Sequence, residues 1–334
     1  MTLPAPLLSV RDLKVHFEIK GDSPWPWTPS RWLKAVDGVS FDISPGETLG
    51  IVGESGCGKS TLARAMLNLI PATAGSIVWQ GQELYGASPQ VWQGVRKSVQ
   101  MIFQDPLASL DPRMTIGQII AEPLRTHHPN MSAPEVMQRV RAMMERVGLT
   151  EQQINRYPHE FSGGQCQRIG IARALVMEPR LVICDEPVSA LDVSIQAQII
   201  NLLMELQRQM GLALVFIAHD LAVVRHISQR VMVMYLGRTM ELADKQAIYQ
   251  NPSHPYTQAL LSAIPTPDPR RERHKTLQLL QGDLPSPINP PSGCIFRTRC
   301  PKAAPSCAEQ KPELRALNAG TQVACDLIRD SVLV

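Results

Sequence analysis

The chain has 334 residues, with 33 lysines and arginines against 30 aspartates and glutamates and a formal net charge of +3. So small an excess gives no reason to expect a nucleic-acid partner. No apolar run approaches the roughly 18 residues that a membrane-spanning helix needs, and the first residues lack the basic start and apolar stretch of a secretory signal. We therefore expect a cytosolic chain that forms one large domain with an appendage, or two domains.

Apolar strands alternate with helices along most of the chain. Residues 13–19 alternate apolar and polar side chains as a half-exposed strand does, whereas residues 181–184 and 213–218 are continuously apolar, which is typical of buried parallel strands. Residues 131–148 and 195–210 repeat apolar side chains at helical spacing. This alternation predicts an α/β fold with a mostly parallel core sheet.

The composition changes after residue 262. Seven prolines between positions 265 and 291 preclude long helices there, and four cysteines follow within the last part of the chain. The sequence therefore predicts a main domain over residues 1–262 and a small C-terminal module over residues 263–334. Within the main domain, the Pro- and Trp-rich residues 21–31 are predicted to form a loop.

Residues 53–60 match the phosphate-loop pattern G-x-x-x-x-G-K-[ST] at every fixed position. An apolar strand precedes them and a helical segment follows, which is the context that a true phosphate loop requires. Glycines allow successive N–H groups to face an anion, the lysine reaches the β- and γ-phosphates, and the serine hydroxyl holds Mg²⁺. The predicted site for a nucleoside triphosphate consists of Gly53, Glu54, Ser55, Gly56, Cys57, Gly58, Lys59, Ser60 and Thr61.

Two acidic residues, Asp185 and Glu186, end the apolar run at residues 181–184. Ligands of α/β proteins bind at the carboxyl ends of such strands. Asp185 is predicted to hold Mg²⁺ directly or through water. Glu186 is predicted to polarise the water that attacks the γ-phosphate.

The remaining motifs follow an order that resembles ATP-binding-cassette ATPases. Gln104 is similar to the glutamine of their Q-loop, residues 161–165 resemble their signature, residues 189–192 resemble their D-loop, and His219 resembles their switch histidine. The resemblance covers more than 200 residues. It implies a phosphate-loop NTPase fold with an antiparallel β subdomain and a helical subdomain at about residues 105–178.

The resemblance also implies roles for individual residues. Glu186, His219 and Gln104 would serve hydrolysis, with Gln104 also reaching the Mg²⁺. Phe17 would stack on adenine. ATP would lie between two such chains and bind the signature and D-loop residues Ser162, Gly163, Gly164, Gln165 and Asp192.

Residues 103–113, 251–261 and 284–294 extend the likeness to oligopeptide and dipeptide importers nearly end to end. This resemblance implies ATP-driven peptide import at the cytoplasmic face of the bacterial inner membrane. The expected partners are a homologous second ATPase, two membrane permeases and a periplasmic peptide-binding protein, with no nucleic acid. Nickel and some sugar importers share this tail, and a soluble ATPase outside transport is a further alternative.

The late cysteines, Cys294, Cys300, Cys307 and Cys325, follow the spacing C-x5-C-x6-C-x17-C. This spacing matches neither the common zinc sites nor the usual ferredoxin runs. A small, core-poor module often needs a covalent or metal staple. The resemblance to peptide-importer tails suggests a structural [4Fe–4S] cluster on the four thiols, with zinc or free thiols as the alternatives.

Overall fold

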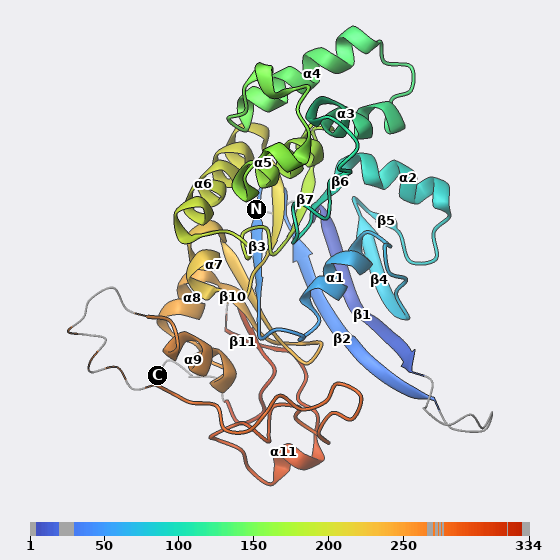
Figure 1. Ribbon diagram of the computed structural model, residues 1–334. Helices are drawn as coiled ribbons and strands as arrows, with labels where there is room; N and C mark the ends of the chain where they lie inside the picture. Colours follow the sequence, from blue (N-terminus) through green and yellow to red (C-terminus); the bar gives the residue numbers. More distant parts are fainter. Residues whose placement is uncertain are drawn as a thin grey trace. The chain divides into compact units, whose positions relative to one another are not determined.

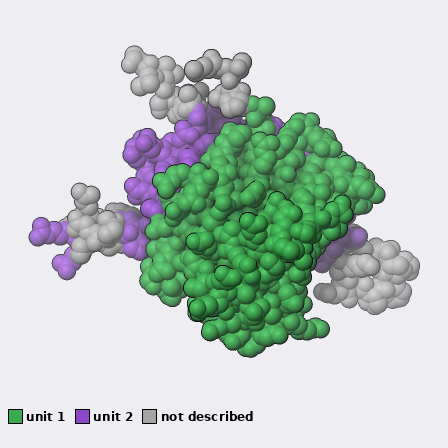
Figure 2. All heavy atoms as spheres, turned by 90° about the horizontal axis from the view of Figure 1, so that it is seen from above, with its two compact units in different colours: residues 1–7, 43–48, 79–218 green, residues 8–42, 49–78, 219–334 purple. Residues whose placement is uncertain are grey.

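The computed structural model describes residues 5–19, 30–265, 270, 273, 275, 277–318 and 320–328. Most of the loop predicted over residues 21–31 lies outside them. The chain forms two compact units: residues 1–7, 43–48 and 79–218 make unit 1, and residues 8–42, 49–78 and 219–334 make unit 2 (Figure 2). Among the described residues, no helix is both long and apolar enough to cross a bilayer.

In unit 1, strand β7 lies between two parallel neighbours. Ile183 of β7 is opposite Met101 on one side and Val215 on the other. Every residue of β7 and β8 is buried, as expected for parallel strands that are covered on both faces. The strands of this unit are β5 (Gln82–Glu83), β6 (Val99–Ile102), β7 (Leu181–Asp185) and β8 (Ala213–Ile217).

Two helices of unit 1, α3 (Ile116–His127) and α4 (Ala133–Arg146), begin at residues whose side chains cap them. Thr115 forms a capping box with Gln118, and the Ser132 side chain accepts from the N–H of Glu135. Helix α5 contacts β6 and packs against α3, α4 and α6 (Figure 1). The helices are α2 (Pro89–Ser98), α3 (Ile116–His127), α4 (Ala133–Arg146), α5 (Gly163–Leu175) and α6 (Val193–Met210), with 3₁₀ turns η1 (Glu151–Gln153) and η2 (Pro158–Glu160).

The main strands of unit 2 pair in the order β11-β12-β10-β9-β3. β3 and β9 are parallel, whereas the other three pairs are antiparallel. The sheet is therefore mixed, because the short Leu236–Gly237 connection can join β9 to β10 only as an antiparallel hairpin. The strands are β3 (Thr48–Val52), β9 (Arg230–Tyr235), β10 (Arg238–Asp244), β11 (Arg315–Asn318) and β12 (Thr321–Val323).

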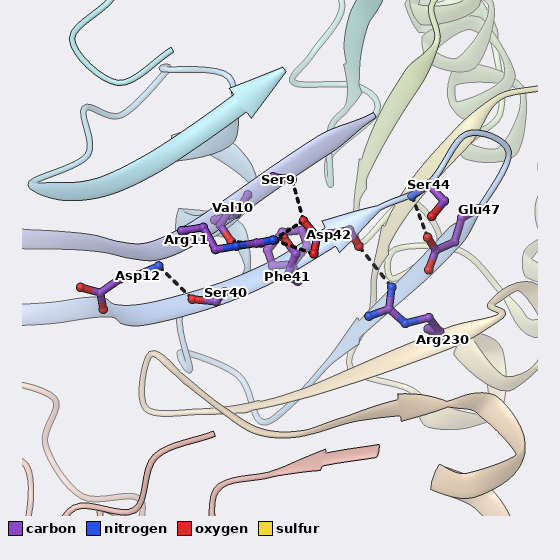
Figure 3. A network of polar contacts seen from close by, with 10 residues as sticks. All are labelled: Ser9, Val10, Arg11, Asp12, Ser40, Phe41, Asp42, Ser44, Glu47 and Arg230. Atoms are coloured by element: carbon purple, nitrogen blue, oxygen red, sulfur yellow. Dashed lines mark hydrogen bonds and ion pairs between the residues drawn. The ribbon is translucent and has the colours of Figure 1, made fainter. Parts of the chain in front are cut away.

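Three further strands of unit 2, β1 (Leu8–Ile19), β2 (Arg31–Ile43) and β4 (Ala74–Trp79), pair in the order β2-β1-β4. Figure 3 shows a polar network across β1 and β2. Both guanidinium contacts of Arg11 with the Asp42 carboxylate are 2.7 Å long, and Ser9 donates to the same carboxylate. Arg230 of β9 donates to the Asp42 carbonyl oxygen at 3.2 Å. The Arg11–Asp42 ion pair is exposed, so it contributes only about 0–1 kcal/mol.

The helices of unit 2 are α1 (Lys59–Met66), α7 (Leu221–Ile227), α8 (Lys245–Gln250), α9 (Pro255–Ser262) and α11 (Ser306–Glu309). An aromatic cluster lies beside α9. The Phe296 ring contacts Tyr235, Tyr256 and His254, with ring centroids 5.3–5.6 Å apart. Phe296 is 1% exposed, so this cluster attaches the cysteine-containing segment to the rest of unit 2.

His254 makes the stability of unit 2 depend on pH. Burial lowers its pKa from 6.5 to about 4, although a contact with the Ala324 backbone opposes this shift. Below about pH 6.5, His254 is protonated in the unfolded chain but stays neutral in the folded chain until the pH approaches about 4. We therefore expect the free energy of unfolding to fall by up to about 3 kcal/mol as the pH drops from about 6.5 to about 4.

The control is His254→Asn. Its side-chain oxygen can still accept the N–H of Tyr256, as Nδ1 of His254 does at 3.0 Å, but it does not titrate. Thermal melts of both proteins across this pH range check the expectation. A wild-type melting profile that runs parallel to that of His254→Asn would contradict it.

Candidate nucleotide site

The phosphate loop of unit 2 adopts a backbone that only glycine accepts at two positions. Gly53 follows β3 with φ +157°, and a Cβ there would lie 2.2 Å from the Met234 carbonyl oxygen. Gly58 begins α1 with φ +101°, and its Cβ would lie 2.0 Å from the Ala35 carbonyl oxygen. The loop is therefore curled and closely packed, as expected for backbone that wraps an anion at a helix N-terminus.

Lys59 lies inside this loop and is only 4% exposed. Its ammonium donates to the carbonyl oxygens of Gly53 and Glu54 at 2.9 and 3.1 Å. These contacts fix the positive charge against the loop backbone, and a lysine at this position of a phosphate loop binds the β- and γ-phosphates. Lys59 is thus a buried, fixed positive charge within the loop, which suits the binding of a triphosphate.

The Gly58→Ala variant should lose both fold stability and nucleotide binding. The added methyl group would clash with backbone, and alanine resists this left-handed conformation, so we expect a loss of about 2–4 kcal/mol. Gly56→Ala is the matched control, because φ is +77° there but nothing lies within 4 Å of the added Cβ. It should lose only about 1–2 kcal/mol. Equal losses in thermal melts would contradict this account.

The side chains of Tyr256 and Arg299, which lie outside the loop, both bind Glu54, and the sequence interpretation missed both. The N–H of Glu54 donates to the Tyr256 hydroxyl oxygen at 3.1 Å, so this N–H is not one of those that face an anion. The Arg299 guanidinium pairs with the Glu54 carboxylate. No spacing rule links positions so far apart. The resemblance of residues 251–261 to peptide importers covers Tyr256, but no motif in the sequence analysis includes Arg299.

In unit 1, the predicted catalytic carboxylate has a direct partner. The Gln104 side-chain amide donates to a Glu186 carboxylate oxygen at 3.2 Å, across 82 residues of sequence. Because β6 and β7 are parallel neighbours, the residues that follow them lie at one edge of the sheet. Within unit 1, the structure thus brings together Gln104 and Glu186, and it places Asp185 at the buried end of β7, next to Glu186 in sequence.

Glu186 has the left-handed backbone conformation, with φ +46°. Its N–H donates to the Ile217 carbonyl oxygen at 3.0 Å, and its own carbonyl oxygen accepts from the Ser189 hydroxyl at 3.0 Å. Such a conformation is costly for a residue with a side chain and persists where the surroundings impose it. These contacts therefore fix the direction in which the carboxylate leaves the strand.

The signature residues form the start of α5. Ser162 is its N-cap, and its hydroxyl accepts the N–H of Gln165 while the Gln165 side chain accepts the N–H of Ser162. Gly163 and Gly164 occupy the first turn, where backbone N–H groups lack intrahelical acceptors. A Cβ on Gly164 would lie 2.6 Å from the Ile195 side chain, so glycine allows α5 and α6 to approach here.

Asp192, His219 and Phe17 are three further predicted site residues, and each is described within its own unit. Asp192 is the N-cap of α6, and hydrogen bonds from Ser194 and the N–H of Ile195 lower its pKa. His219 is exposed in unit 2, next to the N-cap of α7. Phe17 lies on β1, the strand of unit 2 that contacts α1, and is 37% exposed. Its exposure leaves the ring accessible to a planar ligand.

The prediction that the four late cysteines bind a metal as an iron–sulfur cluster is wrong. Within the described residues, which include all four late cysteines, no group of three or more His, Cys, Asp or Glu side chains is placed to hold a metal ion. The four cysteines are free, and the buried Phe296 anchors the segment instead.

Comparison with known proteins agrees with this arrangement. A family model described as ABC transporter matches residues 36–189, and one described as Oligopeptide/dipeptide transporter, C-terminal region, matches residues 240–307. The chain is 68% identical over 308 residues to the oligopeptide transport ATP-binding protein OppF of Escherichia coli, with 92% of each chain covered. The chain belongs to the ABC transporter ATPases of the oligopeptide transport family. It is 62% identical to OppF of Haemophilus influenzae, with 96% of each chain covered.

Solved structures of ABC ATPases have the same fold. The ATP-binding cassette MJ0796, in a dimeric post-hydrolysis state bound to ADP and Pi, matches with a TM-score of 0.63 and 26% identity, covering 71% of this chain and 98% of that one. The cbiO1 protein of Clostridium perfringens, part of the transporter complex cbiONQ, matches with a TM-score of 0.62 and 27% identity, covering 74% and 91%. This ABC ATPase is therefore an ATP-binding, ATP-hydrolysing subunit of a transporter.

Proposed function

We propose that this ABC ATPase hydrolyses ATP to power the import of oligopeptides through a membrane transporter. The observation that carries the proposal is the high identity to proteins named for oligopeptide transport, which extends beyond the ATPase motifs into the C-terminal region. In this proposal the chain works at the cytoplasmic face of the inner membrane, with a homologous second ATPase, two permease subunits and a periplasmic peptide-binding protein.

The phosphate loop binds the triphosphate in this mechanism. Gly53 and Gly58 allow the tight curl of the backbone, α1 directs its N-terminus toward the loop, and Lys59 supplies a positive charge that is already positioned. Ser60, Asp185 and Gln104 are the residues that would hold Mg²⁺, which neutralises phosphate charge when it is bound. A hydroxyl, a carboxylate and an amide oxygen suit this hard cation.

Glu186 orients and activates the attacking water in this mechanism. Its carboxylate is fixed by a constrained backbone and by the Gln104 amide. Hydrolysis of ATP depends mainly on positioning and charge stabilisation, so a carboxylate held in one direction lowers the barrier without further chemistry. Gln104 thereby connects the hydrolytic carboxylate to the segment that follows β6, which we propose transmits closure to the permeases.

Signature residues complete the proposed reaction from a second ATPase chain. Ser162 and the first-turn N–H groups of Gly163 and Gly164 form a helix N-terminus, which favours negative charge. Binding of ATP between two chains would close the dimer, and hydrolysis would open it. His219 and Asp192 belong to the same proposed interface.

Uptake of labelled tri- to pentapeptides tests the proposal in cells that lack this chain and any redundant peptide importer. Restoration of uptake by the wild-type gene, together with unchanged uptake of nickel and sugars, is the expected result. Restored uptake of nickel or a sugar with no change in peptide uptake would assign another cargo to the same ATPase.

A further inference from the structure

The phosphate loop forms an ion pair with the C-terminal part of unit 2. Both contacts of the Arg299 guanidinium with the Glu54 carboxylate are short, at 3.0 and 2.9 Å. The Arg299 side chain is 10% exposed and that of Glu54 is 26% exposed. A half-buried pair with short contacts to both oxygens is held more firmly than a typical surface ion pair.

The surroundings of Arg299 keep its side chain in place. The backbone N–H of Arg299 donates to the Phe296 carbonyl oxygen at 3.0 Å, and the guanidinium lies 5.9 Å from the centre of the Tyr235 ring. Burial opposes the charge on Arg299, but contacts with Tyr235 and Glu54 outweigh this effect and raise its pKa. The guanidinium is therefore a positive charge that is held between the aromatic cluster and the loop residue Glu54.

Tyr256 holds the same loop residue from a second direction. Its hydroxyl oxygen accepts the Glu54 N–H, and its ring packs against Tyr235 and Phe296. Backbone and side chain of Glu54 are thus both bound by residues of one buried cluster. Because its backbone N–H and its carboxylate are both bound, Glu54 is restricted in conformation.

Glu54 also poses an electrostatic problem for a phosphate loop. Its carboxylate is a negative charge three residues from Cys57 and five from Lys59, within the segment that is to bind a polyanion. Without a partner it would repel the triphosphate. Arg299 neutralises this charge where it arises.

We propose that Arg299 is a positioning residue for ATP. By binding the Glu54 carboxylate, Arg299 holds the phosphate loop in its conformation and cancels a negative charge that would repel the triphosphate. The inference rests on the proposed binding of nucleotide at residues 53–60. It adds that the region beyond the ATPase motifs is part of the nucleotide site. Arg299 acts through Glu54 and need not touch the nucleotide.

The test measures ATP hydrolysis in membranes that contain the full-length chain with its transporter partners. Arg299→Gln removes the positive charge, and the double variant Arg299→Gln with Glu54→Gln removes both charges. Arg297→Gln is the matched control, because Arg297 lies in the same segment but its side chain bonds only to Ser292 among the contacts described. Thermal melts of the purified chains establish that each variant is folded.

We expect Arg299→Gln to raise the KM for ATP about tenfold with little change in kcat, since the pair affects binding of ATP and its transition state alike. The double variant should regain most of the wild-type affinity. The excess KM of Arg299→Gln should shrink as the salt concentration rises from about 0.05 M to about 0.5 M, because salt screens the repulsion. Arg297→Gln should match the wild type.

A wild-type KM in Arg299→Gln would overturn the inference. So would an elevated KM that persists equally in the double variant at every salt concentration, because loosened packing alone would then explain it. A different variant tests whether ATP binds at residues 53–60 at all. If it does not, Lys59→Ala would hydrolyse ATP with the wild-type KM.

Discussion

Replacement of Glu186 by glutamine is expected to slow ATP hydrolysis by at least about 100-fold while leaving ATP binding intact. The amide has the size and shape of the carboxylate but cannot accept a proton from water. The Gln104 amide can still donate to the remaining side-chain oxygen, as it does at 3.2 Å in the wild type, so the local structure should persist. Phosphate release and nucleotide binding, measured on the same preparation, separate the two effects.

Glu205→Gln is the control for this prediction. Glu205 lies on α6 in the same unit, and its carboxylate accepts only from the Gln209 side chain among the contacts described, at 3.0 Å. It should hydrolyse ATP at the wild-type rate. Wild-type turnover in Glu186→Gln would show that another group activates the water.

Replacement of Lys59 by alanine should weaken ATP binding by about 100-fold or more. The variant loses a charge that contacts phosphate, and hydrogen bonds to charged groups are each worth about 1.5–3 kcal/mol. It also leaves the carbonyl oxygens of Gly53 and Glu54 without the ammonium that now joins them. Titration with a fluorescent ATP analogue measures the change.

Lys302→Ala is the matched control, because Lys302 is an exposed lysine of the same unit. Its affinity for ATP should equal that of the wild type. If Lys59→Ala also bound ATP as the wild type does, the loop at residues 53–60 would not be the nucleotide site.

Local patterns predicted the elements that carry the site. The apolar run at residues 181–184 corresponds to β7, which ends at Asp185, and the helical spacing over residues 195–210 corresponds to α6. The phosphate loop joins β3 to α1 as its pattern requires. These predictions succeed because the physical requirement lies within a few neighbouring residues: continuous apolar side chains for a buried strand, and glycine where φ is positive.

Long-range contacts were beyond such patterns. No periodicity indicates that β10, β11 and β12 extend the sheet of unit 2 with antiparallel pairs, or that Gln104 binds Glu186. The pair of Arg299 and Glu54 joins residues 245 positions apart. Such contacts depend on how the chain folds back on itself, which single-sequence periodicity does not encode.

For the late cysteines, the sequence led to a metal site that the described residues do not form. Four thiols in a Pro-rich segment suggested a staple, because so short a stretch was expected to bury little apolar area. The structure buries Ile295 and Phe296 between the cysteines, with exposed fractions of 7% and 1%. These two side chains provide the attachment that a metal was expected to supply. Spacing of thiols alone did not reveal this packing.

The central claim is that ATP hydrolysis at this site drives peptide transport. Membrane vesicles that contain the transporter with either the wild-type chain or Glu186→Gln, supplied with ATP at the face that bears the ATPase, test it most directly. Peptide accumulation and phosphate release are measured in the same sample. The account predicts that both occur with the wild type and that both are lost with Glu186→Gln. Peptide accumulation that continues when phosphate release is abolished would contradict it.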